Sequence, residues 1–248
     1  MIKAIFFDFN GVIIDDETIQ MKAYQEVLSG HQVPVTEDLY FGALGMDDKT
    51  FVRSMFAQAK KPLSDPLLSE VLSAKTDLHR QMIEDELPLF PGVLTFLKAA
   101  SREFQLGLVS MANLTEVSYV FQRAHLTPLF AIVITAEDAT VCKPAPHCYV
   151  AGLMKLNDLR QHERMLPLLA SECLAIEDSP PGIQSARAAG MRTLGVTNTV
   201  ADEELRAAGA DVVTKSLADW TVEAVKLVFL DADFTDFSGL TCKSIPIL

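Results

Sequence analysis

The chain has 248 residues, of which 49% are hydrophobic and 22% charged, and it carries a formal net charge of -12 at pH 7. This composition excludes global disorder, and the acidic balance without any basic run argues against DNA or RNA binding. The four cysteines lack paired CxxC spacing. They therefore argue against a disulfide scaffold or a zinc ribbon and favour a reducing, cytoplasmic location.

The first element that we expect is a short buried strand at residues 3–7, where β-branched and aromatic side chains run without alternation. Asp8 ends this run before it reaches the length of a signal sequence, and no later apolar stretch is long enough to span a membrane. We therefore expect a protein that is neither exported nor bound to a membrane.

The segment 16–87 is rich in Leu, Met, Ala, Gln, Glu and Lys, with breaks at glycines and prolines. It predicts several helices and is too long for a single crossover helix. We expect a small helical cap domain, hinged near 13–16 and 86–92, that closes over the site. The motif PLFPG at 88–92 marks the return to the sheet domain, because two prolines prevent a helix from continuing.

Further strand-like runs follow, separated by helix-like stretches, at 104–109, 131–135, 173–176, 193–196 and 211–213. Repeated βα units of this kind predict a doubly wound, Rossmann-like α/β core with a parallel sheet. The core would comprise 1–15 and 88–230, and residues 231–248 would form a C-terminal tail of unknown packing.

Polar side chains stand at or soon after the ends of four of these strands, namely Asp8, Ser110, Lys143 and the pair Glu177 and Asp178. Open α/β sheets bind ligands outside the carboxyl ends of their strands, so these side chains are expected to share a site. Each also has an ordinary structural explanation, as a turn residue, a strand-end hydroxyl, a surface lysine or a helix cap. Taken together, the strand ends present a carboxylate, a hydroxyl, an ammonium and a carboxylate pair, and four such groups at one edge favour a functional site.

The segments FFDFNGVIIDDE, LGLVSMAN, VCKPAPHCY and CLAIEDSPPGIQSARAAGM resemble, in this order, the four motifs of the haloacid dehalogenase superfamily. The last segment and the early insertion resemble its β-phosphoglucomutase-like, helical-cap phosphatase group. The resemblance implies Mg²⁺ as cofactor and hydrolysis of a small phosphorylated metabolite through an aspartyl-phosphate intermediate. We expect a monomer or a weak homodimer.

The resemblance also implies a role for each motif residue. Asp8 would attack phosphorus, with Asn10, Ser110 and Lys143 as its catalytic neighbours. Mg²⁺ would be held by Asp8, the backbone carbonyl of Asn10, Glu177 and Asp178. The phosphate- and substrate-binding residues would be Gly11, Gly45, Ser110, Met111, Asn113 and Lys143.

Asn10 departs from the family pattern, in which a second Asp at this position protonates the leaving group and then activates water. An amide cannot exchange protons in this way, and positioned acid–base catalysis typically contributes ~10²–10⁴-fold. Three explanations stay open: a slow or specialised phosphotransferase with another base, a catalytically impaired phospho-ligand binding protein, or an Asp-to-Asn change introduced to trap a complex. Glu17, His31 and Asp47 are the next candidates for the proton carrier.

Two other branches of the superfamily also lack an Asp at that position. Haloacid dehalogenases need no Mg²⁺, whereas the Glu-Asp pair after the fourth strand predicts a metal site, and phosphonatases use a cap lysine, for which Lys22 and Lys49 are candidates. The turn at 44–49 is placed like the family's substrate-reading loop, and Lys49 and Arg53 are the only nearby cations for a second phosphate. This favours a phosphatase over a hexose-phosphate mutase-like phosphotransferase.

Overall fold

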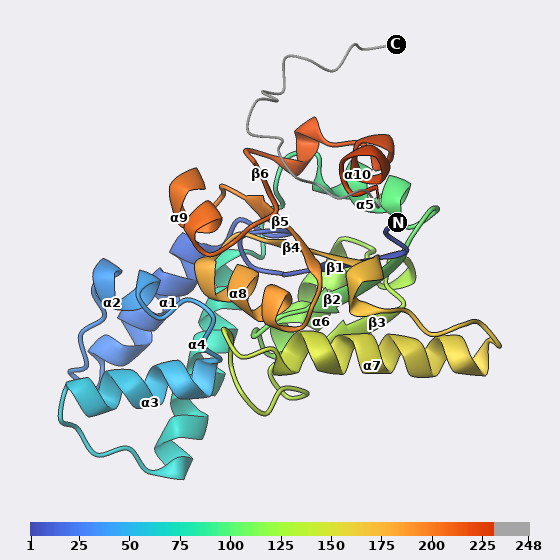
Figure 1. Ribbon diagram of the computed structural model, residues 1–248. Coiled ribbons are helices and arrows are strands. Elements are labelled where there is room, and N and C mark those ends of the chain that lie inside the picture. The colour runs from blue at the N-terminus through green and yellow to red at the C-terminus, as the bar shows by residue number, and fades with distance from the viewer. Residues whose placement is uncertain (231–248) are drawn as a thin grey trace.

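The computed structural model describes residues 1–230, and the predicted tail at 231–248 lies outside the described residues. Its centre is a six-stranded parallel sheet with the strand order β3-β2-β1-β4-β5-β6 (Figure 1). The strands are β1 (Ala4–Phe7), β2 (Gln105–Val109), β3 (Ile132–Ile134), β4 (Cys173–Glu177), β5 (Arg192–Val196) and β6 (Val212–Thr214). Each predicted strand is present, so the doubly wound, Rossmann-like α/β fold is confirmed.

Helices cover both faces of the sheet because its central strands are apolar on both sides. In β1, Ile5 and Phe7 pack with residues of α5, α6 and α10, whereas Ala4 and Phe6 pack with residues of α7 and α8. The helices of the core are α5 (Val93–Ala100), α6 (Leu114–Arg123), α7 (His147–His162), α8 (Pro180–Ala188), α9 (Asp202–Ala207) and α10 (Val222–Val228), with short 3-10 helices η1 (Thr127–Leu129), η2 (Ala170–Glu172) and η3 (Leu217–Asp219).

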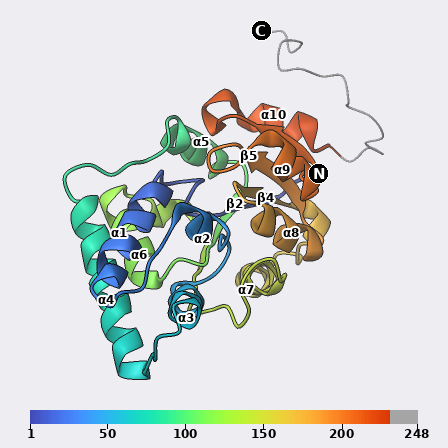
Figure 2. The same ribbon diagram turned by 90° about the vertical axis from the view of Figure 1, so that its left-hand side faces the viewer.

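The chain between β1 and α5 forms the predicted helical cap, drawn in blue to cyan on one side of the molecule in Figures 1 and 2. Three of its helices are N-capped by side chains: Thr36, Asp47 and Ser64 each accept a hydrogen bond from a backbone N–H of the first turn. The cap has an apolar core of its own, which includes Tyr24 and Phe51. The cap helices are α1 (Glu17–Ser29), α2 (Glu37–Phe41), α3 (Asp48–Gln58) and α4 (Asp65–Met82).

Two connections join the cap to the sheet domain, and they are hydrogen-bonded to each other. The backbone N–H of Asp15 donates to the carbonyl of Pro88 at 2.6 Å, and that of Phe90 donates to the carbonyl of Ile13 at 3.2 Å. We refer to residues 13–15 and 88–90 as the strap. The strap begins only a few residues after Asp8, so it connects the cap directly to the carboxyl end of β1.

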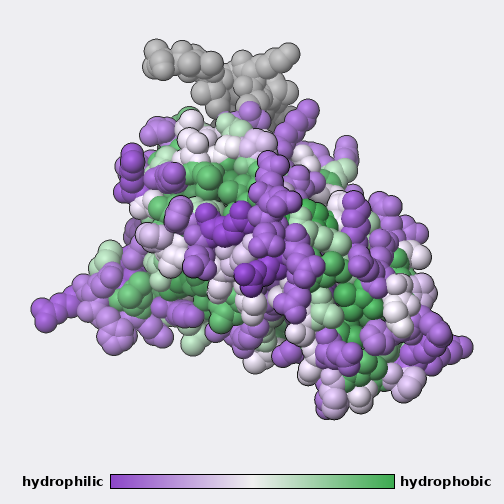
Figure 3. All heavy atoms as spheres, turned by 180° about the vertical axis from the view of Figure 1, so that it is seen from behind, coloured by the Kyte–Doolittle hydropathy of each residue, from purple (hydrophilic) through white to green (hydrophobic). Residues whose placement is uncertain are grey.

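Hydrophilic side chains cover much of the face shown in Figure 3, as the net charge of -12 leads one to expect. Hydrophobic residues gather there in smaller groups between them. Within residues 1–230, no helix combines the length and the apolar character that crossing a membrane requires.

Candidate active site

The carboxyl ends of β1, β2 and β4 lie next to one another because β1 pairs with both other strands. Asp8 follows β1 directly, Ser110 follows β2, and Glu177 is the last residue of β4. Lys143 comes from the loop between β3 and α7. The topology therefore gathers at one edge of the sheet the side chains that the sequence places at separate strand ends.

Lys143 links two of these carboxylates. Its Nζ lies 2.8 Å from Asp8 Oδ2 and 2.7 Å from Glu177 Oε1, and the ammonium is almost fully buried. Burial alone would lower the pKa of Lys143, but the charges of Asp8 and Glu177 outweigh this effect and raise the pKa above its ordinary value. Lys143 is therefore a fixed positive charge beside Asp8 at neutral pH.

Asp8, Glu177 and Asp178 form an acidic cluster in which one oxygen of each lies within 4.8 Å of the others. Burial, followed by the charge of Asp8, raises the pKa values of Glu177 and Asp178 well above the ordinary range. Buried Glu177 Oε2 has no hydrogen-bond partner among the described residues. Three hard carboxylate ligands beside a single ammonium, with one buried oxygen left without a partner, fit a divalent cation such as Mg²⁺.

Two glycines make room for the acidic cluster. Gly11 has a φ of +72°, and a Cβ there would overlap the carboxylate of Asp178 and the hydroxyl of Thr199. A Cβ at Gly182, in the first turns of α8, would overlap the carboxylate of Glu177. Both glycines therefore let backbone approach the carboxylates closely, and the sequence analysis singled out only Gly11.

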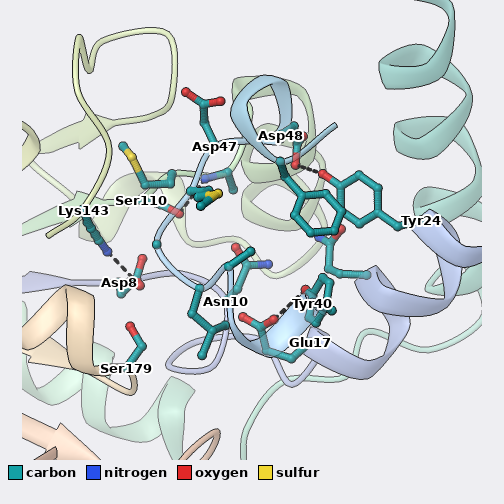
Figure 4. Close-up of a pocket in the computed structure, with 18 of the residues that line it drawn as sticks. Asp8, Asn10, Glu17, Tyr24, Tyr40, Asp47, Asp48, Ser110, Lys143 and Ser179 are labelled. Carbon is teal, nitrogen blue, oxygen red and sulfur yellow. Dashed lines mark hydrogen bonds and ion pairs between the residues drawn. The ribbon is translucent and has the colours of Figure 1, made fainter. Parts of the chain in front are cut away.

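A pocket lies between this edge of the sheet and the cap (Figure 4). The predicted site residues that line it are Asp8, Asn10, Gly45, Ser110, Met111, Lys143 and Asp178. Gly45 and its neighbours 43–48 form one part of the wall contributed by the cap, and a Cβ at Gly45 would come within 3.1 Å of both Pro181 and Lys143 side chains. The predicted substrate-reading turn thus lies next to Lys143, the lysine that is paired with Asp8.

Three predicted site residues do not line the pocket. Gly11 and Glu177 stand behind it, where they contact or form the acidic cluster. Asn113 caps α6: its Oδ1 accepts the N–H of Glu116, and its Nδ2 donates to Asp48 at 2.9 Å. Both ends of the Asn113 amide are occupied, so this side chain joins the core to the cap.

The side chain of Asn10 is hydrogen-bonded to Asp16, which lies in the predicted hinge and directly precedes the first cap helix. Its Nδ2 lies 2.9 Å from Asp16 Oδ1 and 3.0 Å from Oδ2. Asp16 is fully buried, does not cap α1 with its side chain, and also contacts Gln20 Nε2 at 3.1 Å and His79 Nε2 at 2.8 Å. The amide of Asn10 therefore suits this position as a donor to Asp16, whereas a second carboxylate there would repel Asp16.

The side of the pocket around Tyr24 and Asp48, away from Asp8 in Figure 4, is called the far wall here. It contains a lysine that the sequence analysis missed. Lys75 on α4 is almost fully buried and lies 3.2 Å from Asp48 Oδ1 and 2.9 Å from Glu116 Oε1. Burial would lower the pKa of Lys75, but these two carboxylates raise it above its ordinary value. Lys75 is therefore charged and already neutralised by its neighbours, whereas Lys49 and Arg53 do not line this pocket.

A signal for Lys75 exists in the sequence. The buried positions of α4 are 68, 71, 75 and 79, and this spacing is one face of a helix. A lysine and a histidine on the inner face of an amphipathic helix must find polar partners there, because a buried charge without one is very costly. The prediction failed because residues of α4 were judged by their distance along the chain from the turn at 44–49.

Three comparisons place the chain among known proteins. It is 26% identical over 228 residues to a phosphorylated carbohydrates phosphatase of Thermotoga maritima, covering 86% of this chain and 94% of that protein. It is 20% identical to a β-phosphoglucomutase structure from Clostridium difficile, with a TM-score of 0.79 over 92% of this chain and 97% of that one, which confirms the fold. It also matches the chloroplastic protein SUPPRESSOR OF QUENCHING 1 of Arabidopsis thaliana at 23% identity over 90% of this chain, which is only 20% of that protein's length.

The model of the haloacid dehalogenase-like hydrolase family matches residues 2–190, which is more than half of the chain. This range includes Asp8 after β1, the cap, the loop with Lys143 and the acidic pair Glu177 and Asp178 at the end of β4. The chain therefore belongs to the haloacid dehalogenase-like hydrolase family.

Proposed function

We propose that this chain is a metal-dependent phosphatase of small phosphorylated sugars and that Asp8 is its nucleophile. The observation that carries the proposal is the carboxylate of Asp8 on the pocket wall, 2.8 Å from the buried ammonium of Lys143 and beside two further carboxylates. The similarity to a phosphatase of phosphorylated carbohydrates supports the substrate class.

The residues around Asp8 have distinct tasks in this reaction. Asp8 attacks phosphorus, and Lys143 offsets the repulsion between the carboxylate and the phosphate oxygens. Ser110 Oγ accepts the N–H of Ala112 at 3.0 Å, so its own proton stays available for a phosphate oxygen. Phosphoryl transfer depends mostly on such positioning and charge neutralisation.

The acidic cluster would hold Mg²⁺ through Asp8, Asp178, the carbonyl of Asn10 and, directly or through water, Glu177. When bound, the cation would supply positive charge against the phosphate oxygens. Its charge would also offset the repulsion between Asp8 and the acidic pair, while Lys143 would continue to hold Asp8 Oδ2.

The charge of the far wall supports a phosphatase over a mutase. A mutase of this group must bind a second phosphate at the distal end of its substrate, and Lys75 is the cation found there. This lysine is already paired with Asp48 and Glu116, and Glu17 adds a further acidic group to the same pocket. A hydroxyl-rich, uncharged distal group fits this wall better than a phosphate does.

The metal role of the acidic cluster is tested by stability as well as by activity. At a Mg²⁺ concentration of 100 times its dissociation constant, we expect the cation to stabilise the wild type by about 2.7 kcal/mol, because it binds only the folded state. Asp178→Asn should lose this stabilisation, whereas Asp158→Asn, at an exposed position on α7, should keep it. Thermal unfolding with Mg²⁺ and with chelator measures the difference. Equal stabilisation of all three proteins would contradict the metal assignment.

The phosphatase function is tested by phosphate release from a panel of sugar monophosphates and bisphosphates. We expect metal-dependent release from monophosphates, with bisphosphates poorer by at least about tenfold. Isomerisation of a hexose phosphate without release of phosphate would favour a mutase-like phosphotransferase. Ligand-dependent stabilisation without any turnover would favour the phospho-ligand binding protein that Asn10 suggests.

A further inference from the structure

The pocket needs a proton carrier that is not Asn10. A sugar alkoxide is a poor leaving group unless it is protonated, and the phosphoenzyme must later be attacked by water that gives up a proton. The Asn10 amide is held by Asp16 and has no acidic proton to exchange. The acid–base group must therefore be another side chain on the pocket wall.

Most acidic side chains near the pocket already cap a helix, belong to the acidic cluster or are bound by several other side chains. Asp47 caps α3, and Asp178 belongs to the acidic cluster. Asp48 is bound by a tyrosine, a lysine and an asparagine, and Glu116 by a lysine, a glutamine and a threonine. His31 does not line the pocket. This leaves Glu17.

Glu17 is the first residue of α1 and lines the pocket together with Asp8 and Asn10. The hydroxyl of Tyr40 on α2 donates to Glu17 Oε2 at 2.6 Å, and Figure 4 shows this contact at the pocket wall. No described side chain or backbone group hydrogen-bonds the other oxygen, Oε1. One oxygen of the carboxyl group is thus fixed by Tyr40, and the other is left for the substrate.

The charges around Glu17 suit a group that alternates between acid and base. Burial, then the charge of Asp16 and also that of Asp8, raise its pKa to about 7, although Tyr40 and Lys75 oppose the shift. Asp178 faces it as a further acidic neighbour. A carboxyl group with a pKa near the working pH donates and accepts a proton with similar ease.

We propose that Glu17 is the general acid and base of this active site and takes the part that an aspartate at position 10 plays elsewhere in the family. The proposal rests on the proposed phosphatase function.

Each proton and bond in the two steps is accounted for. In the first step Asp8 bonds to phosphorus, the bond from phosphorus to the sugar oxygen breaks, and the protonated Glu17 gives its proton to that oxygen. In the second step Glu17 takes a proton from water as the water oxygen bonds to phosphorus and the bond to Asp8 breaks. The products are the sugar alcohol group and inorganic phosphate, and both carboxyl groups return to their starting state.

The test compares two leaving groups in Glu17→Gln and in a matched control, Glu26→Gln, at an exposed position on the same helix. p-Nitrophenol leaves as a stabilised anion without protonation, whereas a sugar does not. We expect Glu17→Gln to lose ~10²–10⁴-fold in kcat/KM on the best sugar phosphate of the panel and at least about tenfold less on p-nitrophenyl phosphate. Glu26→Gln should match the wild type on both.

Two further readouts separate acid–base catalysis from a structural role. The fall of kcat/KM on the sugar phosphate above about pH 7 should be present in the wild type and absent in Glu17→Gln, because only the wild type loses this proton. With p-nitrophenyl phosphate, the variant should accumulate the phosphoenzyme, detected by intact-protein mass, because the second step lacks its base. Circular dichroism and the Tm check that the variant is folded, and Glu17→Asp serves as the alternative if it is not.

The outcomes distinguish this proposal from the phosphatase function itself. A phosphoenzyme with equal losses on both esters and an unchanged pH profile would reject the role of Glu17 while leaving Asp8 as nucleophile. Absence of phosphate release by the wild type from every ester, together with absence of a phosphoenzyme in Glu17→Gln, would reject the phosphatase function and the proposal together.

Discussion

Replacement of Asp8 by Asn is expected to lower phosphate release by at least about 10⁴-fold and to abolish the covalent phosphoenzyme, because an amide cannot take the place of the attacking carboxylate. The protein should remain folded, since the charge of Asp8 raises the pKa values of Glu177 and Asp178, and its removal relieves that repulsion. Lys143 keeps Glu177 as a partner at 2.7 Å. The measurement is phosphate release together with the intact mass after reaction and a urea unfolding curve.

Asp15→Asn is the matched control for this experiment. Asp15 is exposed and lies in the same segment after β1, so its replacement should change neither the rate nor the mass signature. Loss of activity in both variants would point to damage of the segment as a whole. Phosphoenzyme formation in Asp8→Asn would show that another residue is the nucleophile.

Replacement of Asn10 by Asp is expected to destabilise the protein by about 3 kcal/mol at neutral pH, because it places a second carboxylate against the buried Asp16. The family resemblance alone suggests that this replacement is beneficial, because it restores the family's usual Asp and should raise turnover. The contact of 2.9 Å between Asn10 Nδ2 and Asp16 Oδ1 is what changes the expectation.

The effect should depend on pH in a defined direction. Two carboxylates in contact share one proton, so the pair has a raised pKa in the folded state. The destabilisation of Asn10→Asp should therefore be small at acidic pH and grow as the pH rises through neutrality. Urea unfolding at pH 5 and pH 8 measures this difference against the wild type.

The exchange variant Asn10→Asp with Asp16→Asn completes the cycle. It restores one amide and one carboxylate in reversed order, so it should recover at least half of the stability lost by Asn10→Asp. Simple additivity of the two single changes would contradict a direct interaction between positions 10 and 16. The exchange also returns a carboxylate to position 10. When it is combined with Glu17→Gln, it should therefore restore part of the activity that Glu17→Gln alone loses on a sugar phosphate.

The sequence was sufficient for the sheet and for the residues at its edge. Continuous apolar runs mark strands buried on both faces, and the polar residue after each run falls at the same edge in any parallel sheet. Asp8, Ser110 and Lys143 could be brought together in this way before any coordinates were known. Their chemical roles remain predictions, as does the division of the chain at 16–87.

The part of the site contributed by the cap could not be predicted in the same way. Lys75, Tyr40 and Glu17 come from three different helices of the cap. Their meeting depends on how these helices pack, and local sequence patterns specify helices much better than the angles between them. The contact of Asp16 with His79 could not be predicted for the same reason, because the two residues lie 63 positions apart in the chain.

The strap connects the cap to the sheet domain at a point close to the active site. The bonds from Asp15 to Pro88 and from Phe90 to Ile13 hold the two connections against each other, which leaves rotation about the strap as the easy motion and resists sliding. Asp16 follows the strap directly and contacts both Asn10 and His79, so the pivot passes close to Asp8, which lies two residues before Asn10. A rotation of a few degrees would leave Asn10 and Glu17 nearly in place while moving the wall around Gly45 farther, in proportion to its distance from the pivot. We therefore expect that opening of the cap by this rotation would admit substrate without disturbing the arrangement of Asn10 and the proposed proton carrier Glu17.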